Sequence, residues 1–326
     1  MSTRGKFLPL LLCFCLPSFT ATLTAQAQTY PSKQLRYIIP YAAGGALDTV
    51  ARAHAQHLSE RLGMSVVPDN RAGASQAIAI EAAAKAAPDG HTLLMGTQSG
   101  LLFLTASRKS LPYDPFKDLA SVSLLVSVPF SLVVHPSVPV NNTQELIDYA
   151  KKNPGKLFYA SAGVGSGHHL VMELFKSRTG IDMVHVPFKN NPLAHTDLLA
   201  NQVQIMFEGP AVNPLVRSGK LRGLASSALA RARGMPDLPT LAETILPGFD
   251  VATWFGLSVP AGTPRPIIDR LNRETGDWLR MPATQEKFAP NGFDLLPSTP
   301  EQMAERIRVE YPIWTKVMRS AGIEPE

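Results

Sequence analysis

Short apolar runs alternate with longer amphipathic stretches along the first third of the chain. The run over residues 35–40 predicts a strand that ends in a turn, and a helix is predicted to follow from about Ala46 to Leu62. Further strands are predicted at 64–68 and 91–96, with an alanine-rich helix over 75–87 between them. This alternation is typical of an α/β fold with largely parallel sheets.

The same alternation returns in the middle of the chain. Helices are predicted over Thr143–Lys152 and His168–Thr179, each ended by a residue that breaks helices. Strands are predicted over Phe130–His135, Lys156–Ser161, Val184–Pro187, Val203–Phe207 and Leu221–Ala225. After a strand from Thr253 through Ser258, the remaining sequence is mostly helical in pattern.

Two strand-and-helix series followed by a helical return predict two lobes, the first completed by the end of the chain. The chain would cross between the lobes near 128–130 and again near 253–256. We therefore expect residues 28–129 and 255–326 in lobe 1 and residues 130–254 in lobe 2.

The first 27 residues have the order of a secretory signal peptide. Arg4 and Lys6 precede an apolar run of about 13 residues, and Ala25-Gln26-Ala27 offers a cleavage site. A membrane-spanning helix needs ~20 apolar residues, so the run is too short to be one. We expect cleavage near Ala27 and a mature protein that works outside the cytoplasm, in the periplasm.

Composition and charge exclude several classes of protein. With 45% hydrophobic residues the chain is not a disordered polypeptide. The net charge of +5 includes Arg4 and Lys6, and the other basic residues are scattered apart from Lys151-Lys152. No nucleic acid partner is expected, since binders of nucleic acid cluster their basic residues. Both cysteines, Cys13 and Cys15, lie in the leader, which excludes disulfides and thiol chemistry from the mature chain.

Two glycine-rich turns, one in each predicted lobe, are the strongest candidates for a binding site. The first is Ala43-Gly44-Gly45 with Asp48, and the second covers Ser161–His168. Each turn connects a strand to a helix, whose first N–H groups lack partners within the helix and lie at the positive end of its dipole. Such turns bind anions without Arg or Lys, so the pair predicts a cleft that grips a carboxylate from two sides.

Patterns of common enzyme sites are incomplete in this sequence. The second turn reads Gly163-x-Gly165-x-Gly167, which lacks the spacing of a dinucleotide fingerprint. No G-x-S-x-G nucleophile motif occurs, and the closeness of Ser166 to His168 in sequence does not make a catalytic triad. We expect no enzyme activity, no cofactor and no metal.

Other polar and aromatic residues each leave two interpretations. His54 and His57 have a spacing near one helical face, as metal ligands would, but no acidic third ligand is obvious, so they are expected to be exposed on a helix surface. Asp48 would interact with the helix dipole or contact a ligand, and Trp254 with Phe255 would pack in the core or line the cleft. Glu208 follows a strand, a position that faces the ligand crevice in open α/β sheets.

Many short stretches, in order along nearly the whole mature chain, match one known family. They are Tyr30-Pro31, Pro40–Gly45 with Asp48 and Ala51-Arg52, Asn70–Gly73, Ala86–Gly90, Leu111–Pro115, Asn153–Lys156, Tyr159–Gly163, Gly167–Leu170, Glu173–Phe175, Val184–Pro187, Trp254–Gly256 and Pro260–Pro264. With them the chain resembles the Bug-type periplasmic solute receptors, the substrate-binding proteins of tripartite tricarboxylate transporters.

The resemblance implies a two-lobed, clam-shell periplasmic-binding-protein fold: two sheets with flanking helices and two crossovers, closing around a small carboxylate. It implies that the carboxylate is held mostly by backbone N–H groups and water. The implied ligand-binding residues are Tyr41, Ala43, Gly44, Gly45, Asp48, Thr97, Gln98 and Ser99 in lobe 1, and Ser161, Gly163, Ser166, Gly167, His168, Phe188 and Glu208 in lobe 2.

The chain departs from the family pattern in the pocket region. It has Phe188-Lys189-Asn190 where Tyr-Lys-Gly is common, and Phe207-Glu208-Gly209 where Phe-Asp-Asn is common. The ligand can therefore differ from the commonest ones, and an aromatic carboxylate is compatible with His168-His169 and Phe188.

The expected function is that of a monomeric receptor, which captures a small organic carboxylate and delivers it to a membrane transporter of the tripartite tricarboxylate type. Two alternatives stay open. One is a secreted α/β hydrolase or esterase. The other is a sensor subunit that presents the ligand to a signalling kinase.

Overall fold

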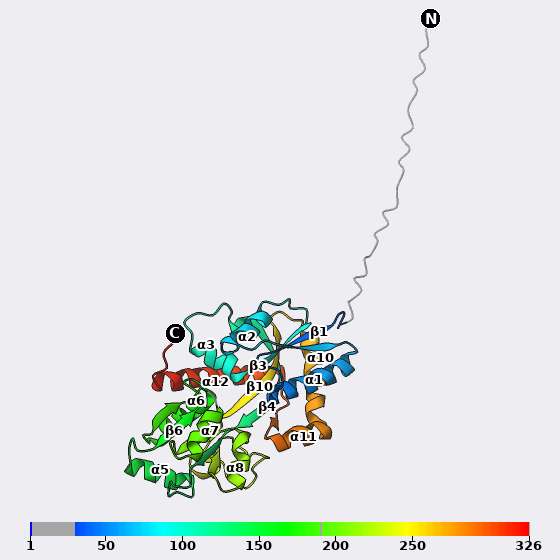
Figure 1. Ribbon diagram of the computed structural model, residues 1–326. Coiled ribbons are helices and arrows are strands. Elements are labelled where there is room, and N and C mark those ends of the chain that lie inside the picture. Colours follow the sequence, from blue (N-terminus) through cyan, green and yellow to red (C-terminus); the bar gives the residue numbers. More distant parts are fainter. Residues whose placement is uncertain (2–29, 190, 326) are drawn as a thin grey trace.

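A computed structural model of the chain describes Met1, residues 30–189 and residues 191–325. Apart from Met1, the predicted signal peptide lies outside the described residues. The chain forms two lobes, each built on one β-sheet flanked by helices (Figure 1). None of the described helices is long and apolar enough to cross a membrane.

Lobe 1 is built on a six-stranded sheet with the strand order β11-β4-β10-β3-β1-β2. Its strands are β1 (Leu35–Ile39), β2 (Val66–Asn70), β3 (Thr92–Thr97), β4 (Leu119–Pro129), β10 (Ala252–Pro260) and β11 (Asp294–Leu295). β1 runs parallel to β2 and β3, whereas β10 is antiparallel to both β3 and β4.

The alternation of side chains along β1 shows how helices cover both faces of this sheet. Leu35, Tyr37 and Ile39 pack in one cluster with α1 (Ala46–Leu62) and α10 (Arg265–Arg280). Ile38 points to the opposite face, into a cluster with α2 (Ala77–Ala84) and α12 (Pro300–Ser320). This lobe also contains the short helical segments η1 (Ala74–Gln76), η2 (Ser99–Phe103), α3 (Leu104–Ala106) and α4 (Pro115–Asp118). Two others, α11 (Pro282–Phe288) and η4 (Ala289–Asn291), follow α10.

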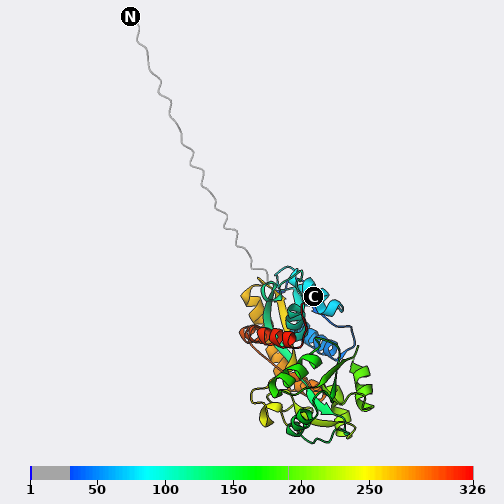
Figure 2. The same ribbon diagram turned by 90° about the vertical axis from the view of Figure 1, so that its left-hand side faces the viewer.

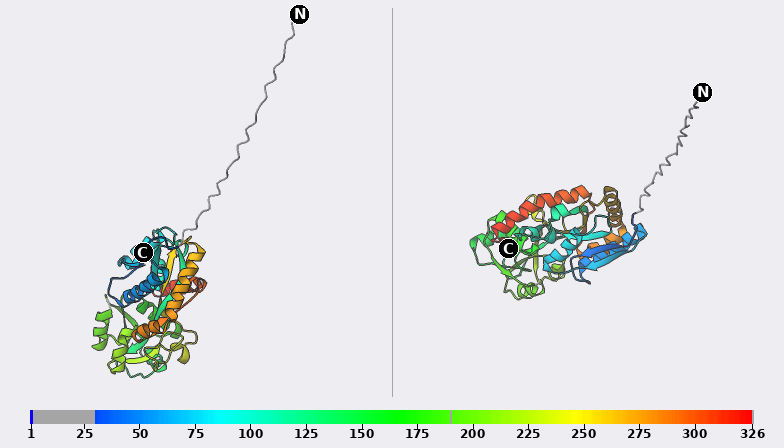
Figure 3. Two further views of the ribbon diagram at one scale, coloured as in Figure 1. Left: turned by 90° about the vertical axis from the view of Figure 1, so that its right-hand side faces the viewer. Right: turned by 90° about the horizontal axis from the view of Figure 1, so that it is seen from above.

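Lobe 2 is built on a five-stranded sheet with the order β7-β6-β8-β5-β9. Its strands are β5 (Ser131–Val134), β6 (Phe158–Ser161), β7 (Val184–Pro187), β8 (Ile205–Glu208) and β9 (Arg222–Ser226). Its helices are α5 (Thr143–Lys152), α6 (Gly167–Thr179), α7 (Asn191–Leu199), η3 (Pro210–Val212), α8 (Asn213–Arg217) and α9 (Leu241–Thr244). The left view of Figure 3 shows this middle part of the chain, in green, below the blue and cyan segments of lobe 1.

Both sheets are mixed, so the prediction of largely parallel sheets is wrong. In lobe 2, β6 is parallel to β7 and β8, but β5 is antiparallel to β8 and β9. The strands next to the crossovers (β4, β5, β9 and β10) supply the antiparallel pairs, because the chain enters and leaves each sheet there rather than through a strand-helix-strand unit.

The two crossovers lie side by side and are hydrogen-bonded to each other. Phe130 separates β4 from β5, and Ser227 follows β9. The backbone N–H of Phe130 donates to Ser227 Oγ at 2.9 Å, and the N–H of Ser227 donates to the Phe130 carbonyl at 2.8 Å. The N–H of Val251, just before β10, donates to the Ser227 carbonyl at 2.8 Å. We call Phe130, Ser227 and Val251 the crossover contact.

The long C-terminal helix α12 lies across the junction of the two lobes (Figure 2). It packs against β4 and η2 of lobe 1 and also contacts α6 of lobe 2. A capping box at its start holds Thr299 and Gln302 together, and its buried face includes Trp314 and Met318. This helix therefore touches both lobes beside the point where the chain crosses between them.

Several predicted elements are confirmed at their stated bounds, namely the helices over 46–62 and 143–152 and the strand over 184–187. The predicted helix over 75–87 is shorter, because Gln76 has a φ of 81° and separates a single 3₁₀ turn from α2. The predicted polar turn at 97–100 is also wrong, since Gln98 is helical and leads into η2.

The prediction of exposed histidines on α1 is wrong for His54. Its side chain is fully buried and stacks on Trp278, with a ring centroid separation of 4.8 Å. Its ring nitrogens lie 3.3 Å from the Tyr37 hydroxyl and 3.1 Å from Thr275 Oγ1. Burial lowers the pKa of His54 to about 3. His57 is half-buried, with Nε2 at 3.1 Å from the Glu274 carbonyl oxygen.

Candidate functional site

The predicted site residues lie where strands end and helices begin. In lobe 1 they follow β1 and β3, and in lobe 2 they follow β6, β7 and β8. A cavity of about 370 Å³ lies between the two sets of loops. It is lined by Gln76, Ser99, Phe103, Leu104, Ser107 and Arg108 of lobe 1, by Val164, Gly165 and Ser166 of lobe 2, and by Met318, Ile323 and Glu324 near the C-terminus. We call it the interlobe cavity.

Ser99 and Ser166 are the two predicted site residues among those that line the interlobe cavity. The other predicted residues lie in the turns and strand ends beside it, and many of their polar groups bond within their own lobe. The sequence analysis missed Gln76, whose left-handed backbone conformation carries no clear sequence signal.

Asp48 organises the first glycine turn from inside. Its side chain is 2% exposed and accepts hydrogen bonds from the N–H of Gly44 at 2.8 Å and from Arg52 Nε at 2.7 Å. Asn70 Nδ2 donates to the other carboxylate oxygen at 2.9 Å. Burial alone would raise the pKa of Asp48, but the hydrogen bonds from Arg52, Gly44 and Asn70 hold it below its usual value. Asp48 therefore supports the turn.

The backbone of the same turn is exposed. Ala43, Gly44 and Gly45 are all exposed, and Gly44 has a φ of 90°. Gly45 begins the 17-residue helix α1, and no side chain caps that end of the helix. The first N–H groups of α1 therefore remain available to an anion.

A chain of side chains links the first turn to the end of β3. Tyr41 Oη accepts a hydrogen bond from Gln76 Nε2 at 3.2 Å, and Gln76 Oε1 accepts one from the Thr97 hydroxyl. Thr97 Oγ1 in turn accepts the N–H of Gly100 at 2.9 Å. Burial raises the pKa of Tyr41 to about 12, so its hydroxyl stays neutral. Through Gln76 this chain reaches the interlobe cavity.

Gln98 points away from that chain toward α12. Its side chain is 2% exposed, and Nε2 donates to Glu310 Oε2 at 2.8 Å. The same oxygen accepts Trp254 Nε1 at 2.8 Å, while Oε1 accepts Arg306 Nε at 2.7 Å. Of the two interpretations of Trp254, packing in the core is confirmed, because its side chain is fully buried. Glu310 thus ties together α12, β10 and the end of β3.

The second glycine turn is held by hydroxyl and imidazole groups. Gly163 N–H donates to Ser161 Oγ at 3.1 Å, and Gly165 N–H donates to His169 Nδ1, also at 3.1 Å. Ser166 caps α6 by accepting the N–H of His169 at 3.3 Å. Ser161 Oγ lies 2.7 Å from His185 Nε2. Gly163 and Gly165 have φ values of 111° and 75°, which glycine adopts without strain.

An aromatic stack that the sequence analysis missed lies beneath this turn. The rings of His169 and His185 are almost parallel, with centroids 3.9 Å apart, and Tyr159 stacks on His185 at 4.8 Å. Burial lowers the pKa of His169. Burial, and then the neighbouring His169, lower the pKa of His185 to about 4. Both rings are therefore neutral supports of the turn at neutral pH.

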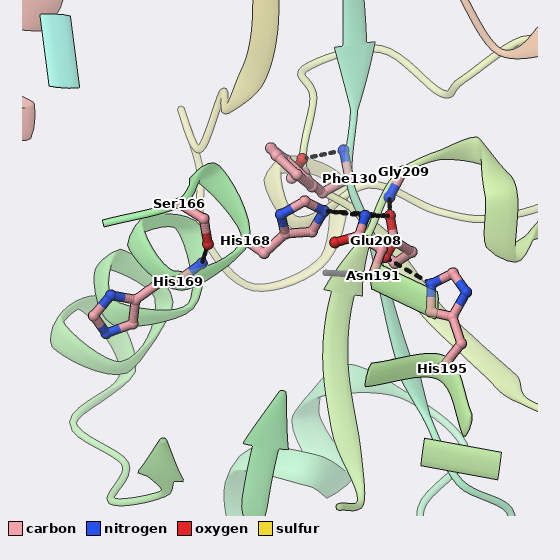
Figure 4. A network of polar contacts seen from close by, with 9 residues as sticks. Phe130, Ser166, His168, His169, Asn191, His195, Glu208 and Gly209 are labelled. Carbon is pink, nitrogen blue, oxygen red and sulfur yellow. Dashed lines mark hydrogen bonds and ion pairs between the residues drawn. The ribbon is translucent and has the colours of Figure 1, made fainter. Parts of the chain in front are cut away.

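Glu208 is the centre of a further polar cluster in lobe 2 (Figure 4). Its carboxylate is 2% exposed. His195 Nε2 lies 2.7 Å from Oε2, and His168 Nε2 lies 3.3 Å from Oε1. Asn191 Nδ2 and the Gly209 N–H donate to Oε1 at 3.2 Å and 2.6 Å. We call Glu208, His168, Asn191 and His195 the Glu208 cluster.

Hydrogen bonding decides the charge of Glu208. Burial alone would raise its pKa, but the hydrogen bonds from His168 and His195 lower it to about 2, so the carboxylate is ionised. Asn191 and His195 were not predicted. They come from α7, and only the fold brings them to the end of β8.

The Glu208 cluster packs against the crossover contact. The ring of His168 meets that of Phe130 edge to face, with centroids 5.3 Å apart. A Cβ atom on Gly167 would come within 3.1 Å of Phe130 Cζ and 3.4 Å of Thr253 Oγ1. Phe188 is half-buried, and its N–H donates to the Ser161 carbonyl at 3.0 Å. His168 and Gly167 therefore lie at the base of the lobes, where they join.

In the part of the chain that the structure describes, no group of three His, Cys, Asp or Glu side chains is arranged to hold a metal ion.

Comparison with known proteins shows which proteins this chain is similar to in sequence and in fold. BugT of Bordetella pertussis is 38% identical over 298 residues, which is 91% of this chain and 91% of that protein. A solved R. palustris protein with adipate is 35% identical, covers 91% of this chain and 100% of its own, and has a TM-score of 0.74. MatC from Rhodopseudomonas palustris, solved with bound malate, is 31% identical with a TM-score of 0.70 and covers 88% of this chain and 99% of its own.

Residues 50–323 match the family described as the tripartite tricarboxylate transporter family receptor. That match takes in most of both lobes, and the similar solved structures cover nearly their full lengths. The chain therefore belongs to the receptor family of the tripartite tricarboxylate transporters.

Proposed function

We propose that this chain is a periplasmic receptor that captures a small organic carboxylate between its two lobes and delivers it to a tripartite tricarboxylate-type membrane transporter. The observation that carries the proposal is the interlobe cavity, because residues of both lobes line it. Gln76 and Ser99 come from lobe 1, and Gly165 and Ser166 come from lobe 2. The family match and the relatives solved with adipate and malate support the ligand class.

In this proposal the carboxylate binds at the uncapped start of α1. Gly44 and Gly45 let the ligand approach the backbone closely, and the helix dipole favours a negative charge there. Gln76 and Ser99 supply neutral side-chain partners from the same lobe, and Ser166 supplies one from lobe 2. Tyr41, Ala43, Asp48, Thr97, Gln98, Ser161, Gly163 and Phe188 would shape the two turns and strand ends around the ligand.

Capture would proceed by closure of the lobes about the crossover contact. The ligand favours the closed state because only there does it contact both lobes at once. The transporter would recognise the closed arrangement. The two lobes would move as two bodies, with residues 28–129 and 255–326 expected in lobe 1 and residues 130–254 in lobe 2. Strand β10 begins at Ala252 and pairs with β4 from there, so the second segment of lobe 1 would begin slightly before residue 255.

The receptor family binds solutes and carries out no reaction, and the hydrolase alternative gains nothing from the structure. Ser166 Oγ accepts the N–H of His169 as a helix cap. His168 is bonded to Glu208 and Asn191. Neither arrangement prepares a nucleophile.

Receptors of this family are periplasmic. For this chain we propose export through the leader of residues 1–27, with cleavage near Ala27, and action as a monomer. N-terminal sequencing of the exported protein tests the cleavage, and light scattering of the purified protein tests the monomer. An unprocessed N-terminus or a stable dimer would contradict these two points.

Binding is tested by thermal shift on protein starting at Gln28, unfolded and refolded to remove any ligand. The panel holds aliphatic di- and tricarboxylates, acidic amino acids and aromatic carboxylates. A ligand at about 1,000 times its Kd adds about 4 kcal/mol to the folded state, which raises the midpoint by several degrees. No shift with any carboxylate would contradict the proposed ligand class.

Delivery to a transporter is tested in cells with the ligand found by thermal shift. Deletion of the gene should abolish high-affinity uptake of the labelled compound. Uptake that survives the deletion, together with loss of a transcriptional response to the compound, would favour the sensor subunit instead.

A further inference from the structure

The two lobes touch at a second place, away from the interlobe cavity. Helix α11 and the end of η4 in lobe 1 meet η3 and the loop after β9 in lobe 2 there. We call this place the α11 contact, and its residues are Pro210, Arg233, Gly234, Gln285 and Gly292.

This contact and the cavity lie on opposite faces of the lobe 1 sheet. Phe288 and Phe293, on either side of Gly292 in sequence, pack in the cluster of α10 on one face. Phe103 and Met318, which line the cavity, pack in the cluster of α12 on the other face. Figure 1 shows strands β4 and β10, which lead to the crossover contact, between α11 with α8 on one side and α12 with α6 on the other. The crossover therefore separates the α11 contact from the cavity.

Polar groups of Arg233 hold one half of the α11 contact. Arg233 Nη1 donates to Gln285 Oε1 at 2.8 Å. The backbone N–H and the charge of Arg233 also act on Asp294 of β11, where burial raises the pKa of the carboxyl and Arg233 opposes that rise. Arg233 belongs to lobe 2, whereas Gln285 and Asp294 belong to lobe 1. These interactions therefore depend on the angle between the lobes.

Glycine allows the other half of the contact to be close. Gly292 has a φ of 77°, and a Cβ atom on it would lie 2.3 Å from Pro210 Cγ. A Cβ atom on Gly234 would lie 3.6 Å from Gly292 Cα. Arg217 Nη2 donates to the Gly234 carbonyl at 2.6 Å, so α8 supports the lobe 2 side. Pro210 and Gly292 thus touch with no room to approach further.

Rotation of the lobes about the crossover contact affects its two sides in opposite ways. Two lobes joined by crossing segments close by a hinge rotation. A rotation that narrows the interlobe cavity moves Pro210 away from Gly292, because the crossover lies between the two places. A rotation that widens the cavity presses this pair together, and the pair already touches.

We propose that the α11 contact is a stop that limits opening of the lobes and opposes their closure, so that Arg233 and Gly292 set the ligand affinity from outside the cavity. The proposal rests on the proposed function, since it takes closure around a ligand as its starting point. The ligand must separate the α11 contact in order to close the lobes, and this cost raises the apparent Kd. Relieving the contact therefore tightens binding without changing the groups that touch the ligand.

Two variants relieve the contact in different ways. Arg233→Ala removes its polar half, and Gly292→Ala places a methyl group inside it and wedges the lobes apart on that side. Arg231→Ala is the control for the first, since Arg231 forms an exposed ion pair within lobe 2. Gly248→Ala is the control for the second, because Gly248 has a φ of 75° and no atom within 4 Å of an added Cβ.

Calorimetric titration measures the affinity, with succinate, adipate, L-malate, L-aspartate and benzoate as probes. For a probe that binds, Kd should fall about threefold in Arg233→Ala and about tenfold in Gly292→Ala, and stay unchanged in both controls. A contact that only stabilises the fold would lower the unfolding midpoint and leave Kd unchanged or higher. Kd values equal to those of the controls would therefore overturn the proposal.

A distance measurement tests the stop without any ligand. Spin labels on Lys109→Cys and Arg178→Cys mark one exposed position on each lobe, and a chain that starts at Gln28 has no other cysteine. Electron paramagnetic resonance of the ligand-free protein should give shorter distances between the labels in Arg233→Ala and Gly292→Ala than in their controls. Unchanged distances would overturn the proposal. Shorter distances with no probe bound would support the stop, while the proposed ligand class would fail.

Discussion

The two glycine turns share one plan but are held by different chemistry. The turn before α1 is organised by a charged group, Asp48, paired with Arg52 at 2.7 Å. The turn before α6 is organised by neutral groups, with His169 and Ser161 as the acceptors for its N–H groups. The lobe 1 turn therefore depends on an ion pair, and the lobe 2 turn on histidines that stay unprotonated.

The two helix starts differ in the same sense. Gly45 leaves the start of α1 without a side-chain cap, whereas Ser166 caps α6 through the N–H of His169. A similar strand-turn-helix sequence thus leaves backbone donors free in one lobe and uses them internally in the other. A glycine-rich turn before a helix therefore does not by itself decide whether the first N–H groups of the helix are free; the polar side chains around the turn decide it.

The largest effect should come from removing the charged anchor of lobe 1. Asp48→Ala leaves Arg52 and Asn70 without their shared acceptor and should cost about 3 kcal/mol in the free energy of unfolding. Denaturant unfolding measures it. Glu81→Ala is the control, because Glu81 pairs with Lys85 on the surface of α2 and its loss should cost less than about 0.5 kcal/mol. Equal stabilities of the two variants would refute the role given to Asp48.

Acid should lower the free energy of unfolding, because histidines that are neutral in the folded protein become protonated in the unfolded chain. In the unfolded chain a histidine takes up its proton near pH 6.5, whereas His185 does so at about 4 in the folded protein. The unfolded state gains protons first as the pH falls, so this stability is complete above about pH 6.5 and is lost toward about pH 4. We expect a loss of about 2 kcal/mol over that range, measured by denaturant unfolding at several pH values.

His185→Gln should flatten this part of the pH profile, since an amide can still bond Ser161 and does not titrate. His135→Gln is the control, because the His135 side chain bonds only Ser137 nearby in the chain among the bonds described. A profile that His185→Gln leaves unchanged would mean that the lobe 2 turn does not contribute to acid sensitivity. His54 of lobe 1, whose pKa burial lowers to about 3, would then be the group to replace next.

Glu310 connects α12 to β10 and to the end of β3 within lobe 1, and its replacement should have an intermediate effect. In Glu310→Gln the new amide group faces the donors of Gln98 and Trp254, so we expect a loss of about 1.5 kcal/mol by chemical denaturation. Glu305→Gln on the same helix is the control, because Glu305 forms an exposed pair with Arg308. A Glu310→Gln variant as stable as Glu305→Gln would contradict this role.

The smallest effect should come from two adjacent glycines in the first turn. Gly44 has a φ of 90° and Gly45 a φ of −76°, and neither has an atom within 4 Å of an added Cβ. Gly44→Ala should therefore cost about 1 kcal/mol from backbone strain alone, and Gly45→Ala a few tenths. Thermal unfolding compares them, and equal midpoints would show that the turn adapts its backbone.

Local signals in the sequence were enough to predict several elements. Helix α1 ends where Gly63 adopts a φ of 69°, and α5 begins at Asn142, whose side chain caps it. Strand β4 was missed, because its serines interrupt the apolar pattern. Ser123 is fully buried and bonded to Ser298, 175 residues away, and no local pattern contains that contact.

The same limit applies to the site. The two turns and Glu208 could be predicted, because each follows an apolar strand. Gln76, His185 and His195 could not, because each acts through a partner on another element, as His195 does with Glu208. His54 was placed on the surface for a similar reason, since the Trp278 that covers it belongs to α10.

The segment that follows α12 offers a place for an optical reporter. Ile323 and Glu324 line the interlobe cavity together with Ser166 of the opposite lobe, and Glu324 is exposed. The only cysteines of the sequence are Cys13 and Cys15, so a chain that starts at Gln28 contains no thiol. A single Glu324→Cys substitution would accept one maleimide dye without side reactions. Its emission would then follow the filling of the cavity in real time, which turns the receptor into a sensor for its own ligand.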